Sequence, residues 1–160
     1  MVYLDHSATT KVRPEVIALM GEVLAATGNP SSIHAAGRGA RKIVEVAREQ
    51  VAKAVNCYVG EVVFTAGGTE ADNLAIKGIY HYQVSRDPQR NKIAVFTLEH
   101  PAVKQSAQFL ESQGAEIVWL PATADGVVNL DLASKLIRDN ASQLALISVM
   151  WVNNELGTCL

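Results

Sequence analysis

The sequence has 160 residues, which is the length of one ordinary domain. Its hydrophobic content of 49%, with 19% charged residues, is typical of a folded globular protein and excludes a disordered chain. Fourteen basic and sixteen acidic side chains leave a formal net charge of −2, which provides no basic surface for nucleic acid or for an anionic membrane.

The sequence also lacks the usual signals for export. No apolar run is long enough to cross a bilayer, and the N-terminus has neither the basic start nor the apolar core of a signal peptide. Cys57 and Cys159 lie far apart and match no metal or redox spacing. We therefore expect a cytoplasmic protein with reduced thiols that binds neither membrane nor nucleic acid.

Two helices are predicted first. Pro14 suits the first turn of a helix, and apolar residues then recur at helical spacing as far as Leu24. The Thr-Gly-Asn-Pro segment at 27–30 breaks this pattern. A second helix is predicted over residues 34–55, with an apolar stripe on one side and charges of both signs on the other. The mixed charge is typical of a solvated helix surface.

From residue 61 onward, short apolar runs alternate with helical patterns. The predicted strands are 62–65, 93–97, 116–120 and 144–150, and the predicted helices are 71–82, 102–113 and 130–137. The last strand is apolar throughout, which suits a parallel strand buried on both faces. This alternation predicts an α/β fold, a three-layer α/β/α sandwich with a mainly parallel sheet and right-handed crossovers.

Polar residues follow three of the predicted strands. In an open parallel sheet, ligands bind outside the carboxyl ends of the strands. The segments 66–70, 98–101 and 152–157 all follow such ends, so we expect them to face one cleft.

Gly67, Gly68 and Thr69 can be interpreted in two ways. They could hold a phosphate, because glycines allow close backbone approach and a helix start offers free N–H groups. Alternatively, Thr69 with Asp72 forms a plain helix cap, and the charge of Glu70 disfavours a nearby phosphate. The sequence contains neither a dinucleotide-binding nor a P-loop glycine pattern.

Two other groups leave alternatives open. His100, just before Pro101, could transfer protons or stack on a flat ligand, or it could simply cap the next helix. Asn153-Asn154-Glu155 could hydrogen-bond a planar heteroaromatic ring, or it could form a turn. The remaining histidines show no metal-ligand spacing, so we expect no metal site.

Five motifs, in order along the whole chain, resemble those of the cysteine desulfurases, which belong to the class V aminotransferase branch of the fold-type I pyridoxal-phosphate enzymes. The segment 28–32, Gly-Asn-Pro-Ser-Ser, is similar to the subgroup that serves iron–sulfur cluster assembly. The motifs are residues 3–10, 28–34, 64–73, 99–100 and 152–155.

The resemblance implies a fold, a cofactor and site residues. Residues 1–12 would form an N-terminal arm, and 13–160 an incomplete large domain that binds pyridoxal 5′-phosphate. Gly68 and Thr69 match the phosphate-binding loop, His100 the histidine that stacks on the ring and moves protons, and Asn154 the asparagine at the ring hydroxyl. The implied transferase activity converts L-cysteine to L-alanine and an enzyme persulfide, in a homodimer that passes sulfur to an acceptor or iron–sulfur scaffold protein.

The chain also departs from the family pattern. The lysine that forms the Schiff base with the cofactor and the cysteine that carries the persulfide have no match in this sequence, and neither Cys57 nor Cys159 stands in the nucleophile's motif. We therefore expect the 160-residue chain to be the front part of a desulfurase and to be inactive alone. Two alternatives are a catalytically dead fragment that acts as a dimerisation or interaction module, and another class V aminotransferase.

Overall fold

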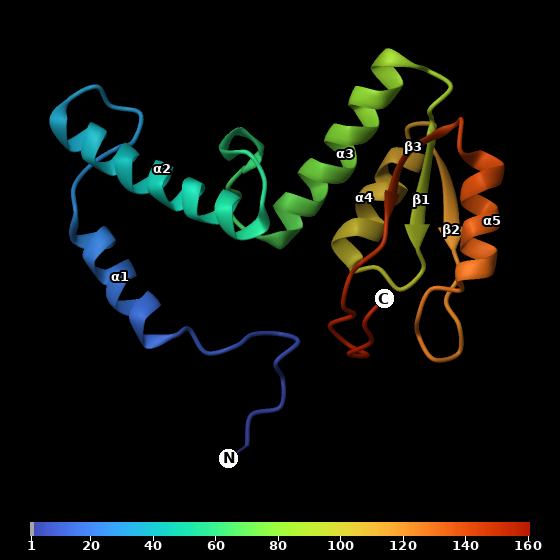
Figure 1. The fold of residues 1–160 in the computed structure, drawn as a ribbon, viewed down its shortest axis with the longest axis horizontal. Coiled ribbons are helices and arrows are strands. Elements are labelled where there is room, and N and C mark those ends of the chain that lie inside the picture. The colour runs from blue at the N-terminus through green and yellow to red at the C-terminus, as the bar shows by residue number, and fades with distance from the viewer. Residues whose placement is uncertain (1) are drawn as a thin grey trace. The chain divides into compact units, whose positions relative to one another are not determined.

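The computed structural model describes residues 2–160, which fall into two compact units, the first ending at Phe64 and the second spanning Thr65–Leu160 (Figure 1). The first unit contains α1 (Pro14–Ala25), α2 (Ala35–Val55) and the short 3-10 helix η1 (Val59–Glu61). Both predicted α-helices are therefore present. None of the helices in residues 2–160 is long and apolar enough to span a membrane.

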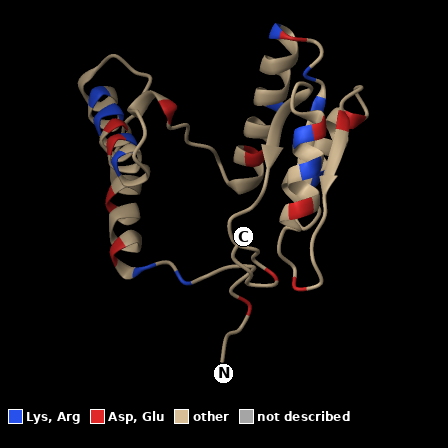
Figure 2. Ribbon diagram, turned by 45° about the vertical axis from the view of Figure 1, so that its right-hand side comes forward, with Lys and Arg blue, Asp and Glu red and all other residues tan. Residues whose placement is uncertain are grey.

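The ends of α2 are set by local hydrogen bonds and backbone geometry. The Nδ1 atom of His34 accepts a hydrogen bond from the backbone N–H of Gly37 at 3.3 Å and so caps the first turn. Asn56 ends the helix in the left-handed conformation, with φ of 56°. Between these ends, Arg48 pairs with Glu45 at 3.4 Å. Figure 2 shows basic and acidic residues interspersed along the helices rather than gathered by sign.

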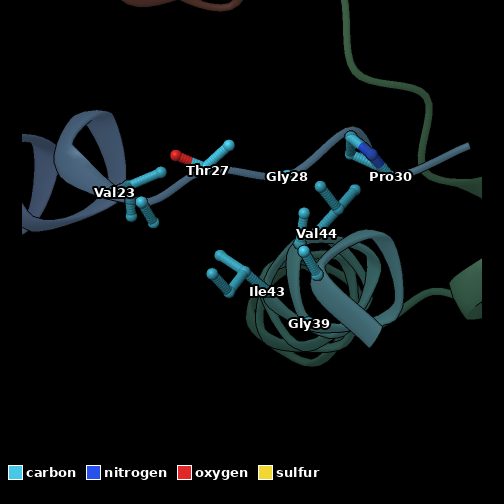
Figure 3. A pocket seen from close by; sticks show the side chains of 10 residues that line it. Val23, Thr27, Gly28, Pro30, Gly39, Ile43 and Val44 are labelled. Atoms are coloured by element: carbon cyan, nitrogen blue, oxygen red, sulfur yellow. The ribbon is translucent and has the colours of Figure 1, made fainter. Parts of the chain in front are cut away.

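The segment between α1 and α2 packs closely on the first turn of α2. A Cβ atom at Gly28 would lie 2.5 Å from the carbonyl oxygen of Ala36, and one at Gly37 would collide with the carbonyl oxygen of Ser32. Asn29 shapes this turn, since its Oδ1 accepts the N–H of Ser31 at 2.9 Å. A cavity of about 390 Å³ opens beside it, with a mainly apolar lining (Figure 3). The lining residues labelled there are Val23, Thr27, Gly28, Pro30, Gly39, Ile43 and Val44.

The second unit is a three-layer sandwich around a parallel sheet, which confirms the predicted fold class. Its elements in chain order are α3 (Gly68–Arg86), β1 (Lys92–Phe96), α4 (Pro101–Glu111), β2 (Glu116–Leu120), α5 (Leu130–Asn140) and β3 (Leu144–Ser148). The strand order is β2-β1-β3, and both pairings are parallel. In Figure 1, α3 and α4 cover one face of the sheet and α5 covers the other.

The central strand β1 has a buried core on each side. Ile93 and Val95 pack with residues of α3 and α4, including Leu110, whereas Ala94 packs with Ala133 of α5 on the opposite face. Successive side chains of a strand point to opposite faces, so every residue of 93–96 is fully buried. This explains why the strand has no polar alternation in its sequence.

The predicted strand over residues 62–65 is wrong. This segment is extended, but no strand pairs with it in the described part of the chain, and Val63 is 65% exposed. An apolar, β-branched run becomes a strand only where a neighbour supplies hydrogen bonds. Here Arg48 holds the segment instead, by donating a hydrogen bond to the carbonyl of Val62 and by placing its guanidinium 5.0 Å from the centre of the Phe64 ring.

Candidate active site

The β1 and β3 strands deliver two loops to the same edge of the sheet. Because the strands are parallel, both carboxyl ends lie at that edge. The loop that follows β1, residues 97–100, is called the β1 loop here, and residues 149–156 are called the β3 loop. They carry two of the four predicted site residues, His100 and Asn154.

His100 ends the β1 loop and caps α4. Its Nδ1 accepts a hydrogen bond from the backbone N–H of Ala102 at 3.2 Å, and Pro101 occupies the first turn of the helix. A ring nitrogen that accepts a backbone N–H carries no proton, so the neutral ring has its proton on Nε2. The ring itself remains exposed. The structure thus shows the capping role and leaves the Nε2–H free for a ligand.

The β3 loop is shaped by Asn153. This side chain is only 5% exposed, and its Oδ1 accepts the backbone N–H groups of Glu155 and Leu156, both at 2.9 Å. Its Nδ2 donates to the carbonyl of Leu98 at 3.1 Å, which ties the β3 loop to the β1 loop. Asn154, the next residue, is exposed. The predicted turn is therefore present, and it presents Asn154 outward.

The two loops enclose a small cavity of about 190 Å³. A pocket for a whole small-molecule ligand usually measures about 300–1,000 Å³, so this cavity corresponds to part of such a site. It combines a histidine, amides, carboxylates and one ammonium group. The residues lining it are Leu98, Glu99, His100, Pro101, Lys104, Asn153, Asn154, Glu155 and Leu156.

Glu99 was not predicted as a site residue, yet it is a buried carboxylate beside His100. It is 4% exposed, and its Oε1 accepts a hydrogen bond from the Ser148 hydroxyl at 3.0 Å. Burial raises the pKa of Glu99, although hydrogen bonds from Ser148 and from the backbone N–H groups of His100 and Met150 oppose the shift. The negative charge of Asp72 raises this pKa slightly further.

In Figure 1, α3 begins at the same end of the second unit as the β1 and β3 loops. Gly67 is the N-cap, and no side chain of the described residues caps the helix. The cap predicted from Thr69 and Asp72 is therefore wrong. The first backbone N–H groups of a helix have no partner within it, so those of α3 are available to an anion.

Gly68 and Thr69 stand at this helix start and are not among the residues that line the cavity. Apart from the adjacent residues and the backbone of α3 itself, no atom of the described residues lies within 4 Å of a Cβ built at Gly67 or Gly68, so the space beside them is open. The carboxylate of Glu70 turns back and accepts the backbone N–H of Ala66 at 2.6 Å. Its charge is thus engaged with the preceding segment.

Neither cysteine belongs to this site. Cys57 is half-buried near the end of α2, and Cys159 is exposed. Among residues 2–160, no group of three or more histidine, cysteine, aspartate or glutamate side chains could hold a metal ion.

Sequence comparison identifies the class of protein. Residues 2–160 match the aminotransferase class-V family, and the chain belongs to this family. Proteins of this family depend on pyridoxal 5′-phosphate. The chain is 46% identical to an IscS-like cysteine desulfurase of Mycobacterium tuberculosis over 161 aligned positions, which cover 100% of this chain and 41% of that protein.

Solved structures agree with the fold. A NifS-like protein superimposes with a TM-score of 0.87 at 32% identity, over 96% of this chain and 41% of that one. SspA in complex with cysteine also gives a TM-score of 0.87 at 32% identity, over 98% of this chain and 44% of that one. The chain thus spans about two fifths of the length of the relatives it matches.

Proposed function

We propose that this chain supplies the phosphate- and ring-binding part of a pyridoxal-phosphate-dependent cysteine desulfurase, which removes sulfur from L-cysteine to give L-alanine and an enzyme persulfide. The observation that carries the proposal is that His100 and Asn154 line one cavity, at the end of the unit where α3 also begins (Figure 1). Similarity to cysteine desulfurases along the whole chain supports it.

The groups at this edge fit the cofactor chemically. The uncapped start of α3 offers backbone N–H groups to a phosphate, and the Thr69 hydroxyl adds a further donor. The open space at Gly68 permits close approach of the phosphate to the backbone. We assign Gly68 and Thr69 to the phosphate on this basis.

His100 and Asn154 would serve the ring. The bond from Ala102 fixes the imidazole orientation, so that its Nε2–H faces away from the backbone and can exchange a proton with bound substrate. The exposed Asn154 amide can hydrogen-bond a ring hydroxyl. When bound, pyridoxal phosphate supplies an electron sink for the substrate amino acid. The chain's residues bind, orient and move protons around it.

Other parts of the reaction would come from outside this chain. We infer that the lysine that holds the cofactor and the cysteine that accepts sulfur are not among its lysines and cysteines, because none of these stands in the motif expected from the family resemblance. We propose that further sequence contributes both, together with a second copy of the enzyme and a sulfur-acceptor partner for iron–sulfur cluster assembly in the cytoplasm. The relatives have room for it, since this chain covers about 41% of the mycobacterial one.

The test compares the 160-residue chain with any longer product of the same gene. Each is given pyridoxal phosphate and L-cysteine, and alanine and sulfide are measured. We expect both products from the longer protein and neither from the 160-residue chain. In the longer protein, His100→Ala should lower kcat about 10²-fold or more, which is the usual contribution of a positioned proton-transfer group.

The control for that variant is His81→Ala, because His81 lies on α3 and is not among the residues that line the cavity. Turnover by the 160-residue chain alone would contradict the proposal that residues outside this chain are required for activity. Amino-group transfer from another amino acid to a keto acid, without sulfide release, would instead identify a class V aminotransferase of different specificity.

A further inference from the structure

Only three polar or charged side chains are buried in the described part of the chain: Glu99, Ser106 and Asn153. Ser106 bonds within its own helix, since its hydroxyl donates to the carbonyl of Ala102 at 2.7 Å. Glu99 instead bonds to Ser148 at the end of β3, and Asn153 bonds to Leu98 in the β1 loop. Buried polar groups are costly unless they are paired, so these two pairings constrain how the loops sit.

The two cross-loop links run in opposite directions. Glu99, in the β1 loop, accepts a hydrogen bond from the Ser148 hydroxyl at the end of β3. Asn153 reaches from the β3 loop to the carbonyl of Leu98 in the β1 loop. Each loop therefore provides one buried side chain: Glu99 is bonded to the end of β3, from which the β3 loop starts, and Asn153 is bonded to the β1 loop.

We propose that Glu99 and Asn153 are positioning residues that lock the two loops together and so fix the spacing between His100 and Asn154. His100 follows Glu99 directly and Asn154 follows Asn153 directly, so each buried residue anchors one exposed neighbour of the cavity. The meaning of this spacing for catalysis rests on the function proposed above. The link between the two loops does not depend on that function.

The lock makes a specific prediction about coupling. If the two links act as one unit, breaking either of them frees both loops. The amides that report on this are the N–H groups of Glu155 and Leu156, which are held by Asn153, and those of Thr97 and Glu99 in the β1 loop, which donate to backbone carbonyls. If the links act independently, each break frees only its own amides.

The experiment is amide hydrogen exchange, followed by NMR, on the 160-residue chain without cofactor. Ser148→Ala removes the hydroxyl partner of Glu99. It should speed exchange at Glu155 and Leu156, on the far link, by about tenfold or more. Asn153→Asp keeps the Oδ1 acceptor but removes the donor to Leu98. It should speed exchange at Thr97 and Glu99, in the β1 loop, by a similar factor.

The matched control is Ser106→Ala, which deletes a buried hydroxyl that joins no loops. It should leave all four reporter amides unchanged. Ser148→Thr retains a hydroxyl and should restore slow exchange. Amides of the central strand, at Ile93 and Val95, should accelerate less than the reporter amides in every variant that breaks a link, because only a general loss of stability would raise all of these rates by the same factor.

Faster exchange confined to each variant's own link would overturn the lock. So would equal effects of Ser148→Ala and Ser106→Ala, or acceleration of the central strand by the same factor as the loops. No cofactor is added, so a failure of the proposed function would leave this readout unaffected. That failure would show separately, as absence of cysteine turnover by the longer protein.

Discussion

Asn153→Ala and Asn154→Ala make the same chemical change at adjacent positions, but the structure predicts that only the first lowers the stability of the fold. Asn153 is buried and satisfies three backbone groups, whereas Asn154 is exposed at the cavity. Asn153→Ala should therefore destabilise the second unit, and Asn154→Ala should leave its stability almost unchanged. Only Asn154→Ala should weaken cofactor binding without loss of folding.

The size of the effect follows from the bonds that are lost. Asn153 makes three hydrogen bonds to the backbone, at 3.1, 2.9 and 2.9 Å. At about 0.5–1.5 kcal/mol for each, their loss should lower the free energy of unfolding by about 3 kcal/mol. An exposed substitution such as Asn154→Ala should stay within about 0.5 kcal/mol.

Urea denaturation followed by tryptophan fluorescence measures this difference. Both tryptophans of the sequence, Trp119 and Trp151, lie in the Thr65–Leu160 unit, so the signal reports that unit alone. With a urea dependence of about 2 kcal/mol/M, Asn153→Ala should lower the midpoint by about 1.5 M. Equal midpoints for Asn153→Ala and Asn154→Ala would refute the reasoning.

Three further predictions use the same chain. Phe96→Ala, at a fully buried position of the central strand, should lower the free energy of unfolding by about 3–5 kcal/mol, as measured by fluorescence-detected denaturation. Phe109→Ala, at a position that is 46% exposed, should lower it far less, and similar losses for the two variants would contradict the assignment of Phe96 to the core. Gly37→Ala should lower the stability of the first unit, because the new Cβ would collide with backbone atoms. Gly39→Ala has open space and should stabilise α2 by about 0.5–1 kcal/mol, and thermal melting followed by the helical circular dichroism signal measures both effects. Because burial raises the pKa of Glu99 in the folded protein, Glu99 stabilises the fold fully at pH values below its pKa in the unfolded chain, and this stabilisation is lost as pH rises through its pKa in the folded protein. Glu99→Gln should therefore flatten that part of the curve of unfolding free energy against pH, and an unchanged slope would show that Glu99 does not cause it.

Much of the second unit could be predicted because its sequence signals are local. The run at 116–120 forms β2 over that same span, and the predicted helices over 102–113 and 130–137 lie on α4 and α5. Pro101 and Gly114 mark the two ends of α4 by backbone preference alone. Parallel pairing then brings the β1 and β3 loops to one edge, which is how His100 and Asn154 could be assigned to a common site.

The features that could not be predicted depend on contacts between residues far apart in the sequence, which a local sequence pattern does not reveal. The segment 62–65 has the composition of a strand, but no strand pairs with it within residues 2–160, and a strand requires a hydrogen-bonded partner. Glu99 carried a visible signal, since a charged residue between a buried strand and a histidine is unusual. Its role could not be predicted because Ser148 is far away along the chain. The same holds for the bond between Asn153 and Leu98.

The strand order β2-β1-β3 has a consequence for the way the chain is made. The central strand is synthesised first of the three, and its second neighbour, β3, is the last. A growing chain can pair β1 with β2 while the other side of β1 still has unpaired backbone groups and an apolar face. Such long-range parallel pairing is slow, and an open edge on a strand that is apolar from Ile93 to Phe96 invites association with other chains. The most deeply buried strand of the finished unit is thus its most vulnerable one during folding, until Leu144–Ser148 arrives.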